Sequence, residues 1–234
     1  MRVLAVGAHP DDLELLCGGT LSRFVREGHQ VTMCHASIGD RGSFVHSAAE
    51  IGQIRLAEAR QAAAIIGADH ATLGLSDGLV NAADQLQRNL AVDLVRSWRP
   101  DLIITHAPND YMADHNETSR LMLDASHIAT LPLIETEHPA HTVVAPVIHM
   151  DTLAGVGFTP TEYVDISDDL EAKLEALQCH ASQLQWLLEH DGIDAIEQTR
   201  VTAAFRGFQS GVPYAEGFSP CLTWLRAKTF RLLP

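Results

Sequence analysis

The chain of 234 residues is 46% hydrophobic and 20% charged, which is typical of an ordinary globular protein with one sizeable α/β domain. Its net charge of −14 disfavours nucleic acid, whose phosphates attract Lys and Arg, and it disfavours an anionic membrane surface. No run of residues approaches the roughly 20 apolar residues of a transmembrane helix, and the N-terminus lacks the apolar core and cleavage site of a signal peptide. We therefore expect a cytoplasmic protein with no nucleic-acid or membrane partner.

In the first half of the chain, apolar runs alternate with helical patterns. Strands are expected at residues 2–8, 30–36, 71–75 and 101–106, and helices at 12–28, 48–67, 81–98 and 116–126. This repetition predicts an α/β fold, namely a Rossmann-like, doubly wound and mostly parallel sheet with helices on both faces. The glycine fingerprint GxGxxG is absent after the first strand, which disfavours nucleotide binding.

The second half is less regular. Strands are expected at 142–150 and 163–165 and one helix, or two, at 170–190, while Gly and Pro punctuate residues 207–220. No repeat or linker divides the chain, so we expect a single domain over residues 1–234. The four cysteines are scattered without a CxxC pair, which indicates free thiols rather than a thiolate metal site.

The first polar cluster, AHPDDLE at residues 8–14, stands where the first strand should end and a helix begin. Ligands of open α/β sheets bind beyond the carboxyl ends of the strands. Pro10 keeps His9 extended, so that a tight turn can place the side chains of His9 and Asp12 on one side. Imidazole and carboxylate together suit Zn²⁺ or a similar divalent ion. The alternative is that Asp11 and Asp12 only cap the helix.

The second polar cluster, at residues 106–115, reads HAPNDYMADH and follows the strand expected at 101–106. In a 3-2-1-4 strand order this strand lies beside the first one, so that both clusters face one crevice. Two histidines and one carboxylate leave a coordination position for water, as in catalytic rather than structural zinc sites. Such water is a usable nucleophile near neutral pH.

With AHPDDLE near the N-terminus and NDYMADH about a hundred residues later, the sequence resembles the PIG-L/LmbE-like family of zinc-dependent N-deacetylases. The resemblance covers most of the chain and extends to GDRGS (39–43), LSDG (75–78), CHASQ (179–183) and PYAEGF (213–218). It implies a hydrolase that removes an acyl group, acetyl above all, from N-acetylglucosaminyl compounds and related amides. It also suggests a homo-oligomer, a trimer or hexamer.

The resemblance implies a role for each matching position. The zinc ligands would be His9, Asp12 and His115, and the general base would be Asp11. Two further positions would contact the substrate, Arg55 and Asp77, although Arg55 could instead pair with Glu58 on its own helix. Supporting positions behind the ligands would be Glu14, Asp114 and His180, and His180 could equally be a structural hydrogen-bonding residue. Tyr214 and Phe218 are expected to pack around the mouth of the pocket.

The sequence departs from the family at Met112. Many members have a histidine there, three residues before the last ligand, which assists the oxyanion or protonates the leaving amine. Here the metal, Asp11 or another histidine must take that role, and His180, His106 and His149 are the candidates. Two alternatives to a sugar deacetylase stay open: an amidase of thiol conjugates or natural-product intermediates, and a non-catalytic metal-binding module. A serine esterase is excluded by the absence of GxSxG.

Overall fold

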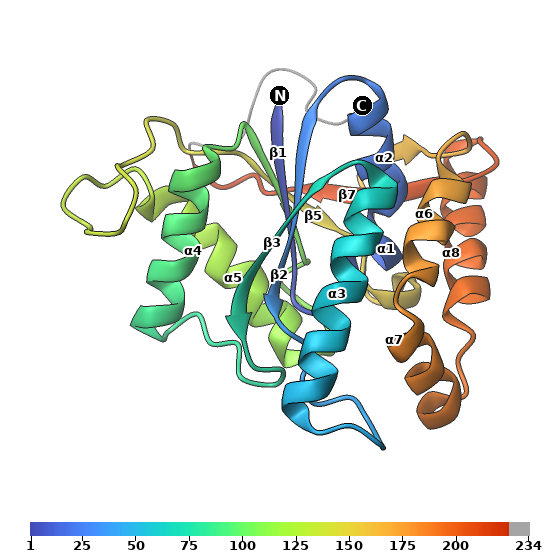
Figure 1. Ribbon diagram of the computed structural model, residues 1–234. Helices are drawn as coiled ribbons and strands as arrows, with labels where there is room; N and C mark the ends of the chain where they lie inside the picture. Colours follow the sequence, from blue (N-terminus) through green and yellow to red (C-terminus); the bar gives the residue numbers. More distant parts are fainter. Residues whose placement is uncertain (225–234) are drawn as a thin grey trace.

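The computed structural model describes residues 1–224, which form a seven-stranded sheet in the order β3-β2-β1-β4-β5-β7-β6 (Figure 1). The order 3-2-1-4 of the first four strands and their parallel pairing are confirmed. β5 also pairs in parallel with β4, whereas β7 runs antiparallel to both β5 and β6. The strands are β1 (Arg2–Gly7), β2 (Gln30–Ser37), β3 (Asp69–Leu75), β4 (Leu102–Thr105), β5 (Val147–Met150), β6 (Glu162–Asp165) and β7 (Ala215–Pro220).

Helices cover both faces of the sheet, as the sequence predicts (Figure 1). Successive side chains of β1 point to opposite faces: Val3 and Ala5 join one buried cluster, and Leu4 and Val6 join the other. The first cluster is closed by α1 (Asp12–Leu16), α2 (Gly18–Arg26), α3 (Ala48–Ile66), α6 (Leu170–Gln178) and α8 (Ala195–Ser210). The second is closed by α4 (Gln85–Trp98) and α5 (Ala113–Ile128). Because both of its faces are buried, β1 is continuously apolar after Arg2.

The single helix expected at residues 12–28 is wrong, because the chain forms two helices that meet at Cys17. The carboxylate of Glu216 accepts hydrogen bonds from the backbone N–H groups of Gly19 and Thr20, at 2.9 and 2.7 Å, and so satisfies the first turn of a new helix. Gly19 also lies against Ile166, where an added Cβ would come within 2.8 Å of that side chain. Both partners come from distant parts of the sequence.

The punctuated segment expected at 207–220 is also wrong in part, since α8 continues to Ser210 and β7 completes the sheet. The helix begins at Asp194, whose side chain accepts a hydrogen bond from the N–H of Glu197, and it ends at Gly211 with φ of 79°. Its buried positions are small or polar, namely Ala195, Thr199, Ala203, Arg206 and Gly207. Without a stripe of large apolar residues, the sequence gives little sign of this helix.

The helix expected at 170–190 is interrupted at His180. It divides into α6, α7 (Ala181–Trp186) and a π-helical turn, η2 (Leu187–Asp191). A short 3₁₀ turn, η1 (Leu153–Gly155), follows β5. Over residues 1–224, no helix combines the length and apolar character that crossing a membrane requires.

His35 on β2 gives the fold a dependence on pH. Its side chain is fully buried, neither ring nitrogen has a hydrogen-bond partner within residues 1–224, and burial lowers its pKa to about 3. The unfolded chain therefore binds a proton here below about pH 6.5 that the folded chain does not bind. The contribution of the neutral, buried His35 to stability is therefore complete above about pH 6.5 and decreases as the pH falls.

We expect His35→Leu to weaken this dependence. Between about pH 7.5 and pH 5, the free energy of unfolding of the parent should fall by about 2 kcal/mol more than that of the variant. Urea unfolding at the two pH values measures the difference, with His46→Leu on an exposed loop as the control. An equal fall in the parent and in His35→Leu would contradict the assignment.

Candidate metal centre and substrate cavity

The turn after β1 brings His9 and Asp12 together. Oδ2 of Asp12 accepts a hydrogen bond from the backbone N–H of His9 at 2.7 Å, and the N–H of Asp12 donates to the carbonyl of His9 at 3.2 Å. The turn is this tight because of Gly7: a Cβ at that position would lie 2.9 Å from the Cβ of Asp12. The side chain of Asp11 makes no capping bond to α1. The alternative of two simple helix caps is therefore wrong.

The start of α5 supplies His115. Its Nδ1 lies 3.1 Å from Oδ2 of Asp110, so the opposite nitrogen, Nε2, faces Asp12. Asp110 is held in turn by Asn116, whose Oδ1 accepts its N–H and whose amide donates to its carbonyl. Metal-ligating histidines usually have such a carboxylate behind them, which fixes the tautomer and the orientation of the ring. Asp110 belongs to the second polar cluster, but its residue type and position alone did not indicate this role.

His9, Asp12 and His115 converge, as the sequence predicts. The His9 and His115 rings lie with centroids 5.3 Å apart, and one donor atom from each of the three residues lies within 4.8 Å of the others. Nδ1 of His9 is 3.5 Å from Oδ2 of Asp12, and Nε2 of His115 is 3.3 Å from Oδ1. Ligands that share one tetrahedral ion at about 2.1 Å lie about 3.4 Å apart. The three residues therefore fit a divalent metal.

Two carboxylates hold His9 from its other side. Its Nε2 lies 3.0 Å from Oδ1 of Asp77 and 3.2 Å from Oδ2 of Asp114, which also accepts the N–H of Gly78 at 2.6 Å. Burial lowers the pKa of His9, but hydrogen bonds to Asp114, Asp12 and Asp77 outweigh burial and raise it well above its ordinary value. Asp114 thus supports a neighbouring group in the site, as expected. Asp77, which lines the cavity, also holds the His9 ring from this side.

His106 lies beneath the ligands and does not line the cavity. Its ring stacks on that of His115 with centroids 3.9 Å apart. Its Nε2 accepts the N–H of Ala8 at 2.9 Å and lies 3.1 Å from Oδ2 of Asp12. His149 contacts the carbonyl of His106 through Nδ1 at 2.9 Å and is equally remote from the cavity. Both are supporting residues in this structure.

Asp11 lies beside the three converging residues on the cavity wall. Its φ of 123° falls in a region that residues other than glycine rarely adopt, and such strain often accompanies functional sites. Burial raises the pKa of its carboxyl to about 6, although Arg55 acts in the opposite direction. Nη2 of Arg55 lies 3.6 Å from Oδ1 of Asp11 and donates to the carbonyl of Pro10 at 2.6 Å. The carboxyl group of Asp11 is therefore shielded from water, and Arg55 balances its charge only in part.

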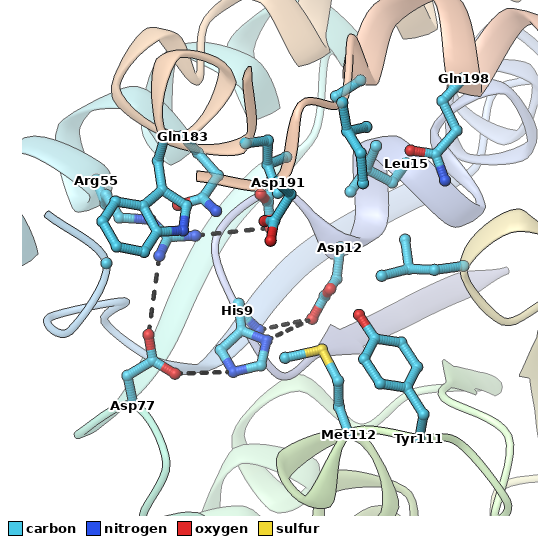
Figure 2. A pocket seen from close by; sticks show the side chains of 17 residues that line it. His9, Asp12, Leu15, Arg55, Asp77, Tyr111, Met112, Gln183, Asp191 and Gln198 are labelled. Carbon is cyan, nitrogen blue, oxygen red and sulfur yellow. Dashed lines mark hydrogen bonds and ion pairs between the residues drawn. The ribbon is translucent and has the colours of Figure 1, made fainter. Parts of the chain in front are cut away.

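Arg55 and Asp77 line the cavity together, with Nη1 of Arg55 3.9 Å from Oδ2 of Asp77 (Figure 2). The alternative pairing of Arg55 with Glu58 is wrong, because Glu58 accepts hydrogen bonds from the backbone N–H and the hydroxyl of Ser182. Gly39 permits the position of Arg55, since a Cβ there would lie 2.5 Å from the guanidinium carbon.

The CHASQ segment joins α7 to the site. Nε2 of His180 lies 3.2 Å from Oε1 of Glu14, and both side chains are fully buried. His180 stands immediately before α7 rather than inside it, and it does not line the cavity. Ser182 bonds to Glu58 on α3, and Gln183 reaches the cavity (Figure 2). The CHASQ segment therefore holds one wall of the cavity against α1 and α3.

The cavity has a volume of about 350 Å³ and two unlike halves around His9 and Asp12. Figure 2 shows Arg55, Asp77 and Gln183 on one side, and Leu15 and Gln198 on the other. The remaining lining residues are Asp11, Gly42, Tyr111, Met112, Leu153, Trp186, Leu187, Asp191, Ile193 and Ala195.

Sequence reasoning missed several cavity residues, among them Trp186, Asp191 and Gln198. The tryptophan ring stacks on that of His190, with centroids 4.6 Å apart, and lies tilted against the ring of Phe44 at 4.4 Å. No motif marks these positions, because they reach the cavity only through the packing of α7, η2 and α8. The expectation that Tyr214 and Phe218 surround the pocket mouth is wrong: neither lines the cavity, and Phe218 is fully buried in the core.

The sheet and its His/Asp cluster define a Rossmann-like α/β enzyme with a site able to hold a metal ion. Residues 4–126 match the family model described as PIG-L: GlcNAc-PI de-N-acetylase, and the chain belongs to this family. The resemblance of the two motifs is thereby confirmed.

Several relatives are named as deacetylases. A 1D-myo-inositol 2-acetamido-2-deoxy-alpha-D-glucopyranoside deacetylase of Actinosynnema mirum is 27% identical over 78% of this chain and 81% of its own. A diacetylchitobiose deacetylase of Thermococcus kodakarensis is 28% identical over 92% of this chain and 81% of its own. The solved N,N'-diacetylchitobiose deacetylase from Pyrococcus horikoshii superimposes with a TM-score of 0.82 at 25% identity, over 94% and 83% of the two chains. These relatives hydrolyse amide bonds, and this chain is an enzyme of the same kind.

The geometry predicts how metal binding responds to substitution. His115→Ala removes one side chain of the candidate metal site and is expected to leave the purified protein without a bound metal ion. Asp110→Asn keeps the ligand but loosens its support, and should weaken metal binding by about 10- to 100-fold. Metal analysis and competition with a chelator measure both effects. His127→Ala, an exposed position on the same helix, is the control. Full metal content in His115→Ala would contradict the assignment.

Proposed function

We propose that the protein is a zinc-dependent hydrolase that removes an acyl group, such as acetyl, from an N-acylated amine of the N-acetylglucosaminyl type. The observation that carries this proposal is the position of Asp11, which lies on the cavity wall directly beside the cluster of His9, Asp12 and His115. Membership of a deacetylase family supports the reaction, and the substrates named for the relatives support the class of amine.

Zinc is the proposed ion because two imidazoles and one carboxylate form a donor set typical of catalytic zinc sites. Its ligands would be His9, Asp12 and His115. The cluster is rich in carboxylates, and these raise the pKa of His9 and also that of His115, which is about 9 despite burial. A site that favours protonated histidines favours positive charge, which a divalent ion would supply. When bound, the ion would polarise the acyl carbonyl and acidify water.

Asp11 is the proposed general base. It would take a proton from the attacking water and deliver it to the leaving nitrogen. Arg55 keeps the carboxyl in place from behind without forming a tight pair, as the separation of 3.6 Å indicates. Met112 lines the cavity but cannot exchange protons, and none of the three candidate histidines, His106, His149 and His180, lines it. We therefore assign both proton transfers to Asp11.

Substrate contacts are proposed for Arg55 and Asp77, whose charged groups face the cavity. Glu14, Asp114 and His180 would keep the ligands and the base oriented. We also propose that residues 1–234 form one domain, of which the last ten residues, 225–234, lie outside the described part. A trimeric or hexameric assembly and a cytoplasmic location complete the proposal.

Asp11→Asn tests the base. Asn tolerates positive φ better than most residues, so the variant should fold and retain its metal. Turnover of N-acetylglucosaminyl substrates should fall by about 10²-fold or more, because the amide cannot accept the proton of water. Steady-state kinetics and metal analysis measure the two properties, and Asp168→Asn, an exposed position, is the control. Full activity with Asn at position 11 would remove this residue from the mechanism.

A further inference from the structure

The cavity is polar on one side of the metal cluster and apolar on the other. Arg55, Asp77 and Gln183 stand on the polar side (Figure 2). Leu15 and Gln198 stand on the opposite side (Figure 2), and the lining also includes the aliphatic side chains of Leu153, Leu187, Ile193 and Ala195. Hydroxyl groups placed against such a wall would lose their hydrogen bonds to water and gain none. A hydroxyl-bearing amine therefore belongs on the polar side, and the acyl group on the apolar side.

The cavity adjoins a second hollow, which has a volume of about 570 Å³ and shares the lining residues Ile193 and Gln198 with it. The other residues that line this hollow are Ala154, Asp194, Glu197, Val201, Thr202 and Phe205. Most of them lie on α8, and the distance from Gln198 to Phe205 along the helix is about 10 Å. We call the two adjoining hollows the groove.

The side chains of this groove are unusually exposed for apolar residues. Val201 and Phe205 are 56% and 51% exposed. Apolar surface of this kind commonly marks a binding groove. Since this hollow adjoins the cavity at Ile193 and Gln198, the occupant that we infer for it is a part of the substrate that extends beyond the cavity.

We propose that the preferred substrate carries a medium-chain acyl group, longer than acetyl, which lies in the groove between Ile193 and Phe205. This inference rests on the proposed function and specifies its acyl group. In the reaction the C–N bond breaks and the oxygen of water joins the acyl carbon. The products are a fatty carboxylate and the free amine, which takes up the proton.

A series of N-acyl-glucosamines from acetyl to decanoyl tests the proposal. We expect kcat/KM to rise about threefold per methylene until the chain reaches the end of the groove, because each buried methylene adds a similar increment of binding. A kcat/KM that is highest for acetyl and falls with every added carbon would overturn it.

Substitutions at the junction of the two hollows test where the acyl chain of the substrate lies. Ile193→Trp, at the junction of the two hollows, should lower the ratio of kcat/KM for decanoyl over acetyl by about tenfold or more, since it removes the burial of several methylenes. Gln198→Trp should act in the same direction if the first variant folds poorly. Leu133→Trp, at a 92% exposed position that lines neither hollow, should leave the ratio unchanged. A ratio insensitive to both junction variants would overturn the proposal.

Binding measurements distinguish a failure of this inference from a failure of the proposed function. In the Asp11→Asn variant, calorimetry measures the affinity of the uncleaved amides. Affinity that rises with chain length supports the groove even if the parent hydrolyses none of them, an outcome that would reject only the hydrolase. Two results together would show that the proposal is wrong: the length of the acyl chain has no effect on affinity, and Val201→Asp changes the mass of the protein in light scattering. In that case a second copy of the protein covers the groove.

Discussion

The carboxylate of Asp12 is the point on which the site depends. One oxygen faces His115 at 3.3 Å, and the other accepts the N–H of His9 and lies 3.1 Å from His106. These contacts tie the end of β1 to the end of β4 and to the start of α5. Because the two strands are neighbours in the sheet, both polar segments emerge at the same edge. Gly7 makes the arrangement possible by leaving room for the Asp12 side chain.

This arrangement concentrates buried acidic groups, which is costly for a protein without compensation. Burial and the neighbouring charge of Asp12 raise the pKa of Asp11, whereas His115 and His106 oppose burial and hold the pKa of Asp12 well below its usual range. The unusual backbone of Asp11 adds to the cost. Such features persist only where the rest of the fold holds them in place. Here the two buried clusters on either side of the sheet provide that support.

Chemistry and selectivity come from different parts of the chain. The metal cluster, Asp11, Arg55 and Asp77 all lie within residues 4–126, the segment that matches the family model. The apolar wall of the cavity comes mostly from residues 153–198, outside that segment. Under the proposed function, the first segment carries out the reaction and the second contacts the acyl group.

The sequence by itself determined the parallel core and the convergence of the two polar motifs. Continuous apolar runs identify buried parallel strands, and polar motifs directly after two of them identify the edge at which His9, Asp12 and His115 meet. Only the tertiary structure decided the break at Cys17, the course of α8 and the walls of the cavity. The break depends on Glu216, about two hundred residues away, and α8 buries small and polar residues that leave no periodic apolar signal. Contacts between distant segments determine these features, and a local pattern of residue types does not encode them.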